Sequence, residues 1–190
     1  MPSADVLSVA LEVAEVLEEL GVTYMVAGSL ASSMHGIPRS TQDIDFVADV
    51  GEEHAQPLAD RLSARYYVDA GMISRAVRNH SSFNVIHLES MLKVDVYVPG
   101  DEPAARAELA RRMTLELPQV PERSITIASP EDTVLQKLLW FRKGDEVSER
   151  QWQDVLGIVK VKHGRLDYEY LRKWAAELGI SDLLKKVLKE

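Results

Sequence analysis

Two aspartates in the stretch DIDFV are the residues whose type and spacing most directly suggest chemistry. Asp43 and Asp45 are two positions apart in a segment that reads as a strand, so their carboxylates project from the same face. Like charges this close repel each other, and without a cation the pair would lose stability or one pKa would rise. Because Mg²⁺ prefers oxygen ligands and needs few protein groups, the pair predicts a site for Mg²⁺ or Mn²⁺.

A third aspartate, Asp95, lies in the alternating segment KVDVYV, which also predicts a strand. If that strand neighbours the DIDFV strand, the three carboxylates converge. Such a cluster can hold one or two metal ions and activate a hydroxyl for in-line attack on phosphorus. The alternative is that DID is a strand end with solvated acids, and that Asp95 lies on an exposed strand face.

A Gly-Ser pair stands upstream of the two aspartates, between the apolar stretch VTYMVA and the short helical stretch SLASSMHG. Gly28 permits close approach of a ligand to the backbone, and the Ser29 hydroxyl and the amides of a helix N-terminus can bind phosphate oxygens. A phosphate-binding turn followed by metal-binding carboxylates predicts a site for a nucleoside triphosphate and its metal.

The stretch AGSLASSMHGIPRSTQDIDFV resembles the first motif of the DNA polymerase beta-like nucleotidyltransferase superfamily, in which Gly-Ser precedes a DxD. Within it, HGIPRSTQDIDF resembles the branch of minimal nucleotidyltransferases and abortive-infection (AbiEii-type) toxin nucleotidyltransferases, through His35, Gly36, Arg39, Thr41 and the DxD. That superfamily places its third carboxylate where this chain has Asp95. The stretch QKLLWFRKGDEVSERQWQDVLGI is similar to a later helix of the toxin branch, with Lys137, Leu138, Arg142, Arg150 and Asp154.

The resemblance implies an enzyme that transfers a nucleotide. It implies that the catalytic set is Asp43, Asp45, Asp95 and Lys137, with the three aspartates as metal ligands. It also implies that the nucleotide-binding set is Gly28, Ser29, Arg39, Thr41, Lys137 and Asp154.

Several of these residues also have structural interpretations. Arg39 could neutralise the acids rather than contact the triphosphate. Lys137 lies in an apolar helix and could extend its ammonium to water. Asp154 could tie helices together, for example by pairing with Arg150 one turn earlier. His35 is expected to cap its helix or to form a structural hydrogen bond.

The elements that must position these residues alternate up to about residue 128 and then become helical. Apolar spacing predicts helices over 5–20, 29–36, 52–64, 71–79 and 101–113, and strands over 22–28, 43–50, 65–69, 82–90, 91–100 and 124–129. Four further helices are expected over 129–144, 148–163, 167–178 and 181–189. The prediction is an α/β (α+β) nucleotidyltransferase core over 1–128, with a mixed, mainly antiparallel sheet, and a helical region over 129–190 that packs on it. Trp140 and Trp152 are interpreted as its anchors.

Composition excludes several classes. Cys is absent, which excludes disulfides, thiolate metal sites and a Cys nucleophile. No apolar run approaches the roughly 20 residues of a membrane span, and the acidic, amphipathic N-terminus is unlike a signal peptide, so a cytoplasmic protein without membrane contact is expected.

Charge is distributed unevenly. The net charge is −8, yet residues 158–190 hold eight bases and five acids. An acidic protein binds nucleic acid poorly without specific contacts, but this basic end could guide a polyanion. It could equally be a solvated helix face.

The leading hypothesis is a Mg²⁺-dependent transfer of a nucleoside monophosphate from an NTP to a hydroxyl of RNA, such as a tRNA, or of a protein. This activity would suit the toxin of a toxin–antitoxin pair, with a cognate antitoxin as partner. One alternative is a catalytically inactive module that binds a nucleotide or a partner. Another is an antitoxin-type minimal nucleotidyltransferase that modifies its partner toxin.

Overall fold

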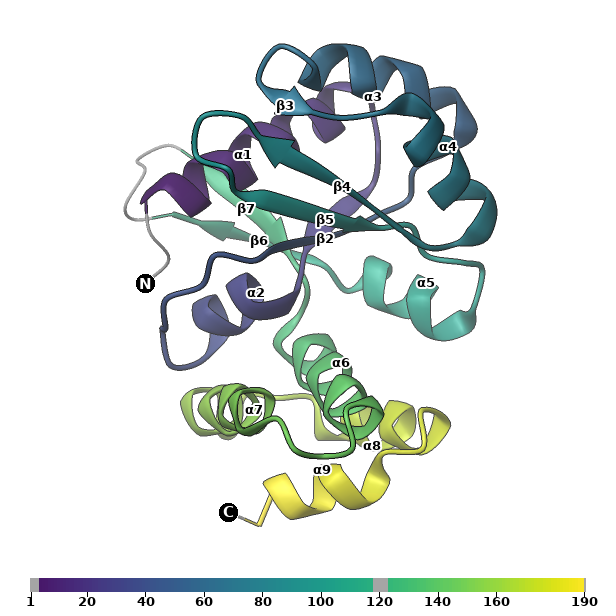
Figure 1. The fold of residues 1–190 in the computed structure, drawn as a ribbon. Coiled ribbons are helices and arrows are strands. Elements are labelled where there is room, and N and C mark those ends of the chain that lie inside the picture. Colours follow the sequence, from purple (N-terminus) through teal and green to yellow (C-terminus); the bar gives the residue numbers. More distant parts are fainter. Residues whose placement is uncertain (1–3, 118–122, 190) are drawn as a thin grey trace.

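The structure is a computed structural model of the 190-residue chain and describes residues 4–117 and 123–189. Its described strands form one seven-stranded sheet in the order β3-β4-β5-β2-β1-β7-β6 (Figure 1). The strands are β1 Tyr24–Val26, β2 Ile44–Ala48, β3 Tyr66–Tyr67, β4 Ser82–His87, β5 Lys93–Tyr97, β6 Met113–Glu116 and β7 Ser124–Ile127. β2 pairs with β5, and β1 with β7, in parallel, while the other four neighbouring pairs are antiparallel. The predicted mixed, mainly antiparallel sheet is confirmed.

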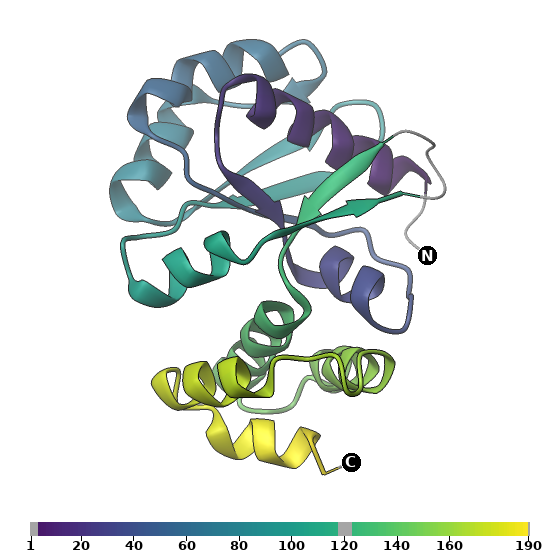
Figure 2. The same cartoon turned by 180° about the vertical axis from the view of Figure 1, so that it is seen from behind.

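Helices lie on both sides of this sheet. The sequence order is α1 Ala4–Glu19, α2 Gly28–His35, the short 3-10 helix η1 Glu52–His54, α3 Ala55–Leu62, α4 Ala70–Asn79 and α5 Pro103–Ala110. The C-terminal helices are α6 Pro130–Lys143, α7 Glu149–Val161, α8 Tyr168–Glu177 and α9 Ser181–Val187. α1, α3 and α4 lie on one side of the sheet, and α2 and the C-terminal helices lie on the other (Figures 1 and 2).

Alternation along the central strands separates a core face from a polar face. In β2, Ile44, Phe46 and Ala48 are buried and pack in the cluster that includes α1, α3 and α4, while Asp45 and Val47 are half-buried on the other face. β5 repeats the pattern, with two buried valines between more exposed polar residues. The face of the sheet away from α1, α3 and α4 therefore carries the polar side chains that could bind a ligand.

Apolar packing falls into two clusters of buried residues. The first runs from Val6 to Ile127 and joins the sheet to α1, α3 and α4. The second runs from Val134 to Val187 and joins α6 to α9, with two alanines of α5 packed against it. The boundary between residues 128 and 129 stays a prediction. None of the described helices is both long and apolar enough to cross a membrane.

Two local expectations need correction. The helix expected over 101–113 ends at Ala110, and Met113 begins β6, an edge strand of four residues. Its apolar alternation, Met-Thr-Leu-Glu, is too short to stand out from the helical pattern before it. Trp152 is buried against the Phe141 ring within the cluster of α6 to α9, and Trp140 is 58% exposed. Trp152 therefore stabilises the interior of the helical region, and neither tryptophan belongs to the buried cluster of the sheet as the expected anchors would.

Candidate active site

The sheet brings two of the three predicted carboxylates into register. β2 and β5 are parallel neighbours, and Asp45 is the direct partner of Asp95. Neighbouring strands are about 4.8 Å apart, and partners in register share a face. Asp43 precedes the first residue of β2 by one position and is exposed. The strand pairing on which the three-carboxylate hypothesis depends is therefore present.

The Gly28 turn lies against the same carboxylate. Gly28 has a φ of +57°, and a Cβ atom built on it would lie 2.0 Å from Asp45 Oδ2. The turn is joined to β2 because the Ala27 amide donates to the Asp45 carbonyl oxygen at 2.8 Å. Glycine is required here twice, for the left-handed backbone and for the close approach of an acidic side chain.

The electrostatics of Asp45 reflect this crowding. Burial raises its pKa, and the Asp95 and Asp43 carboxylates raise it further. The Lys137 ammonium and the hydrogen bond from the Ser29 backbone amide lower it only in part. A bound cation would offset the repulsion between the Asp45 carboxylate and its acidic neighbours.

Lys93 stands beside Asp95 on β5, and no role was assigned to it from the sequence. Its Nζ lies 2.6 Å from Asp95 Oδ2, and this hydrogen bond, together with the charges of Asp95, Asp43 and Asp45, raises the pKa of the ammonium. The signal was present in the sequence, because residues 93 and 95 must share one face of a strand.

The donor chemistry fits a hard divalent cation, since the groups gathered here are carboxylate oxygens. As the side chains stand, however, the described residues hold no group of three acidic, His or Cys side chains in metal-ligating proximity. The metal-ligand assignment of the three aspartates therefore stays a prediction.

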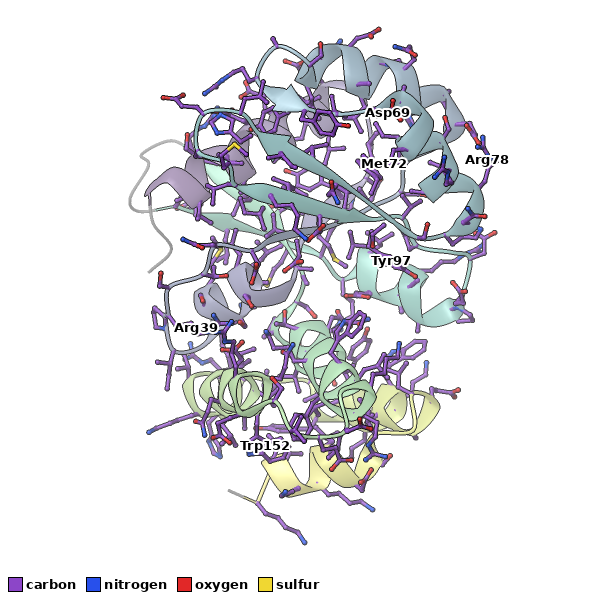
Figure 3. The ribbon with its side chains drawn as sticks, viewed as in Figure 1. Arg39, Asp69, Met72, Arg78, Tyr97 and Trp152 are labelled. Atoms are coloured by element: carbon purple, nitrogen blue, oxygen red, sulfur yellow. The ribbon has the colours of Figure 1, made fainter. Side chains whose placement is uncertain are left out.

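A second cluster of charges lies beside the turn. We define the Asp154 cluster as Asp154 on α7, Arg39 in the connection between α2 and β2, and Lys137 on α6. Arg39 Nε lies 2.7 Å from Oδ1 and Nη2 lies 2.9 Å from Oδ2, while Lys137 Nζ lies 2.7 Å from Oδ2. Figure 3 shows Arg39 between its connection and α7. Asp154 thus pairs with two cations from other elements, rather than with Arg150.

Burial and pairing set the charges of this cluster. Lys137 and Asp154 side chains are each 6% exposed. Although burial would raise the pKa of Asp154, hydrogen bonds from Arg39 and Lys137 outweigh it and lower that pKa, so the carboxylate stays ionised. Burial lowers the pKa of Lys137, against the opposing effect of Asp154. The ammonium also donates to Gln151 Oε1 at 3.1 Å.

The Asp154 cluster is tied to the Gly28 turn. Arg39 Nη2 donates to Ser29 Oγ at 2.7 Å, so one guanidinium joins the first turn of α2 to α7. At the other end of α2, a Cβ on Gly36 would lie 2.8 Å from the Ile158 backbone nitrogen. This close approach holds α7 along α2, which brings Asp154 beside the Gly28 turn.

The remaining candidates have local structural roles. The Asp43 backbone amide donates to Thr41 Oγ1 at 3.2 Å, so this threonine shapes the entry to β2. His35 Nε2 hydrogen-bonds the Ala128 carbonyl at 2.7 Å, which confirms the expected hydrogen-bonding role. The structure thus gathers Gly28, Ser29, Arg39, Asp45, Asp95, Lys137 and Asp154 in one region, with Asp43 at its edge.

Comparison with solved structures identifies the fold. An antigenic nucleotidyltransferase-like protein from Paracoccidioides brasiliensis is similar, with a TM-score of 0.57 and 17% identity over 98% of this chain and 94% of that one. The lincosamide antibiotic adenylyltransferase LnuA, bound to lincomycin, matches with a TM-score of 0.51 and 17% identity over 84% and 98% of the two chains. ANT(2″)-Ia in complex with adenylyl-2″-tobramycin matches with a TM-score of 0.57 and 13% identity over 93% and 97%.

These likenesses confirm the nucleotidyltransferase fold that the first motif predicted. No protein-family model matches the chain, and no curated protein matches it. The finer resemblance to the AbiEii-type branch stays a prediction.

Proposed function

We propose that the protein is a cytoplasmic, Mg²⁺-dependent nucleotidyltransferase that transfers a nucleoside monophosphate from an NTP to a hydroxyl. The observation that carries the proposal is the pairing of Asp45 with Asp95 in register, directly against the Gly28 turn. A nucleotidyltransferase fold alone fixes no chemistry. The Asp45 carboxylate against the Gly28 turn, with Asp95 beside it in register, supplies the oxygen ligands and the backbone amides that this chemistry needs.

In this proposal the three aspartates hold the metal, and the turn holds the triphosphate. Asp43, Asp45 and Asp95 provide carboxylate oxygens, once the Lys93 ammonium moves from Asp95. Mg²⁺ bound there would neutralise phosphate charge and align the hydroxyl with the α-phosphorus. The amides at the start of α2 and the Ser29 hydroxyl would donate to phosphate oxygens.

Lys137 and Arg39 would act from the Asp154 cluster. An ammonium has three donors, and Lys137 uses two on Asp154 and Gln151, so one remains for a phosphate oxygen. Arg39 holds the Ser29 hydroxyl and thereby positions the turn. We therefore assign Lys137 to phosphate binding, and Arg39 and Asp154 to the positioning of Ser29 and Lys137.

The reaction is an in-line displacement. The acceptor oxygen forms a bond to the α-phosphorus as the bond from that phosphorus to the bridging oxygen of the β-phosphate breaks. Asp95, one-third exposed, would take the hydroxyl proton. Pyrophosphate leaves with the bridging oxygen.

The test is transfer of label from each α-labelled NTP, with Mg²⁺, to RNA, to protein, and to the hydroxyls of lincomycin and tobramycin. Asp45→Asn and Asp95→Asn should each lower transfer by about a hundredfold or more, because both would lose a charged oxygen on the metal. Asp49→Asn, a change of the same type just beyond β2, should keep wild-type transfer. Equal transfer by Asp45→Asn and the wild type would refute the assignment.

A second candidate is a module that binds nucleotide without turnover, and it is favoured by the cations that already occupy the acids. Lys93 pairs with Asp95, and Arg39 and Lys137 both pair with Asp154. This candidate predicts that Mg-NTP raises the Tm while no acceptor releases pyrophosphate.

The proposed biological role is that of a toxin that modifies RNA or protein, with a cognate antitoxin as its partner. An antitoxin-type enzyme would instead modify its partner toxin. Expression of the protein alone distinguishes these roles, because a toxin would arrest growth and Asp45→Asn would abolish the arrest.

A further inference from the structure

A polar side chain stands in the middle of β4, beside the aspartate that would take the acceptor proton. Asn84 is the direct antiparallel partner of Asp95, and partners in register share one face of the sheet. Its strand neighbours Phe83 and Val85 are buried on the core face, while Asn84 is half-buried on the opposite face. Because asparagine is depleted in strands, this residue type serves something other than strand formation.

The carboxamide of Asn84 is available to a ligand. Within the described parts of the chain, no hydrogen bond joins it to another protein group, and neither of its polar atoms is both buried and without a partner. On the same face, Ser82 is exposed and its partner Tyr97 is 44% exposed. A carboxamide offers both donors and an acceptor, so Asn84 can bind a hydroxyl group in either sense.

The order of the strands places Asn84 on the acceptor side of the candidate site. Across the sheet that order is β1, β2, β5 and β4 (Figure 1). The groups on this row are, in the same order, the Gly28 turn, Asp45, Asp95 and Asn84. Neighbouring strands are about 4.8 Å apart, so Asn84 is about 10 Å from the strand of Asp45. In-line displacement puts the acceptor opposite the leaving pyrophosphate, and with the triphosphate at the turn this is the β4 side.

The two ends of this row also differ in exposure. All three residues of β1 are buried, and α2 begins directly after it at Gly28. At the other end, the Asp95 side chain is one-third exposed and the Lys93 side chain is about half exposed. An acceptor can therefore reach Asp95 from the side on which Asn84 lies.

We propose that Asn84 binds the acceptor through a second polar group, carried by the carbon next to the one that bears the reacting hydroxyl. The inference rests on the proposed function and narrows its acceptor to molecules such as vicinal diols. Direct partners have Cβ atoms about 4.5–5.5 Å apart, so one hydroxyl can donate to Asp95 while its neighbour hydrogen-bonds Asn84. The first hydroxyl loses its proton to Asp95, its oxygen bonds the α-phosphorus, and pyrophosphate leaves.

The test compares two small alcohols as acceptors, ethylene glycol, which is a vicinal diol, and ethanol. The protein is incubated with Mg²⁺, each α-labelled NTP and one alcohol, and the ratio of labelled NMP ester to free NMP is measured. Free NMP comes from attack by water in the same tube, so the ratio does not depend on how much protein is folded. Per hydroxyl, the wild type should favour the glycol by about tenfold, the effect of one hydrogen bond.

Two alanine variants make the test specific. Asn84→Ala should remove the preference for the glycol. Asn79→Ala is the matched control and should keep it, because Asn79 ends α4, which lies on the other side of the sheet (Figure 2). Mg-NTP should raise the Tm of Asn84→Ala as much as that of the wild type, since Asn84 lies at the opposite end of the row from the Gly28 turn.

Four results would overturn the inference. These are equal transfer to the two alcohols by the wild type, a preference that survives in Asn84→Ala, a preference lost equally in Asn79→Ala, and loss of the Mg-NTP effect on Tm in Asn84→Ala. In each case, transfer of label to RNA, protein or an antibiotic would leave the proposed function standing. A wild type that forms no ester and no free NMP, and labels no acceptor, would instead refute the proposed function and the inference with it.

Discussion

Arg39 binds the Asp154 carboxylate through two nitrogens, at 2.7 and 2.9 Å, although the two residues are 115 positions apart in the chain. The same carboxylate also takes the buried Lys137 ammonium. A bidentate arginine pair fixes direction as well as distance. The connection before β2 is thereby held to the helical region at the point where the Gly28 turn faces Asp45.

Loss of Asp154 should destabilise the protein through Lys137. Asp154→Ala leaves that buried ammonium without its carboxylate, and breaking a buried pair on one side costs about 3 kcal/mol, or roughly 6–12 °C in Tm for a chain of this size. Adding Lys137→Met removes the stranded charge and should recover most of the loss. Differential scanning calorimetry measures both. The exposed Asp182, which pairs with Arg142, is the control, and Asp182→Ala should barely change the Tm. Failure of the double variant to recover would contradict this account.

Gly28→Ala should be costlier than glycine replacement elsewhere. Gly21 has a similar φ of +70° with nothing near its Cβ position, so Gly21→Ala reports the left-handed strain alone, about 1–2 kcal/mol. Gly28→Ala adds a collision with the Asp45 carboxylate. Asp45→Ala removes the two closest atoms, Oδ2 and Cγ, so Gly28→Ala should cost less stability in the Asp45→Ala background than in the wild type. Additive losses in urea unfolding would argue that the collision is absent.

Asp45 should lower the stability of the metal-free protein at neutral pH. Its raised pKa means that, above the ordinary aspartate pKa, the folded chain holds more protons than the unfolded chain. The free energy of unfolding then falls as pH rises through that window. Asp45→Asn removes this decrease in the free energy of unfolding, and its side-chain oxygen can still accept a hydrogen bond from the Ser29 amide. We expect a higher Tm than wild type at pH 7 and no advantage once the pH is below the ordinary aspartate pKa. A lower Tm at pH 7 would contradict the sign.

With a divalent metal bound, the wild type should have a higher Tm than Asp45→Asn. A cation at 100 times its Kd stabilises by about 2.7 kcal/mol, which is roughly 5–10 °C here. Mg²⁺ should therefore raise the Tm of the wild type and of Asp49→Asn, but not that of Asp45→Asn, and EDTA should undo the rise. The same rise in all three proteins would place the metal elsewhere.

Glu108 should give the protein a second pH dependence, outside the site. Burial, and then the Asp132 charge, raises its pKa to about 8, against a hydrogen bond from Gln136. Between its ordinary value of 4.5 and about 8, the folded chain carries one extra proton. Stability should fall by about 1.4 kcal/mol per pH unit over that range from this group. Glu108→Gln should remove that slope, measured by urea unfolding at several pH values. An unchanged slope would show that Glu108 is ionised in the folded protein.

Short-range pattern predicted the parts of the site that lie close in sequence. The Gly28 turn follows from local backbone geometry, and the common face of Asp43 and Asp45, expected from strand alternation, stays a prediction because Asp43 precedes β2. The place of Asp95 required the parallel pairing of β2 with β5, which no local signal specifies, and was reached through the family resemblance. The edge strand β6 was missed because its alternation of apolar and polar residues spans only four positions and directly follows a helical pattern.

The partners of Asp154 show where sequence reasoning stops. Helical spacing suggests Arg150, one turn earlier, because residues four apart are neighbours on a helix. The actual partners come from α6 and from the connection before β2. They are set by how α7 lies along α2, which depends on the Gly36 contact with Ile158. Packing of this kind is a property of the assembled chain.

The two apolar clusters have a consequence for how such a protein could diversify. The sheet keeps its aspartates in register using residues up to Ile127, whereas the helices from Val134 onward share a separate interior. Substitutions within that second interior can alter the surface offered to a substrate without rebuilding the strands. The aspartates of the sheet would stay unchanged, while substitutions among the C-terminal helices would change which acceptor the protein modifies.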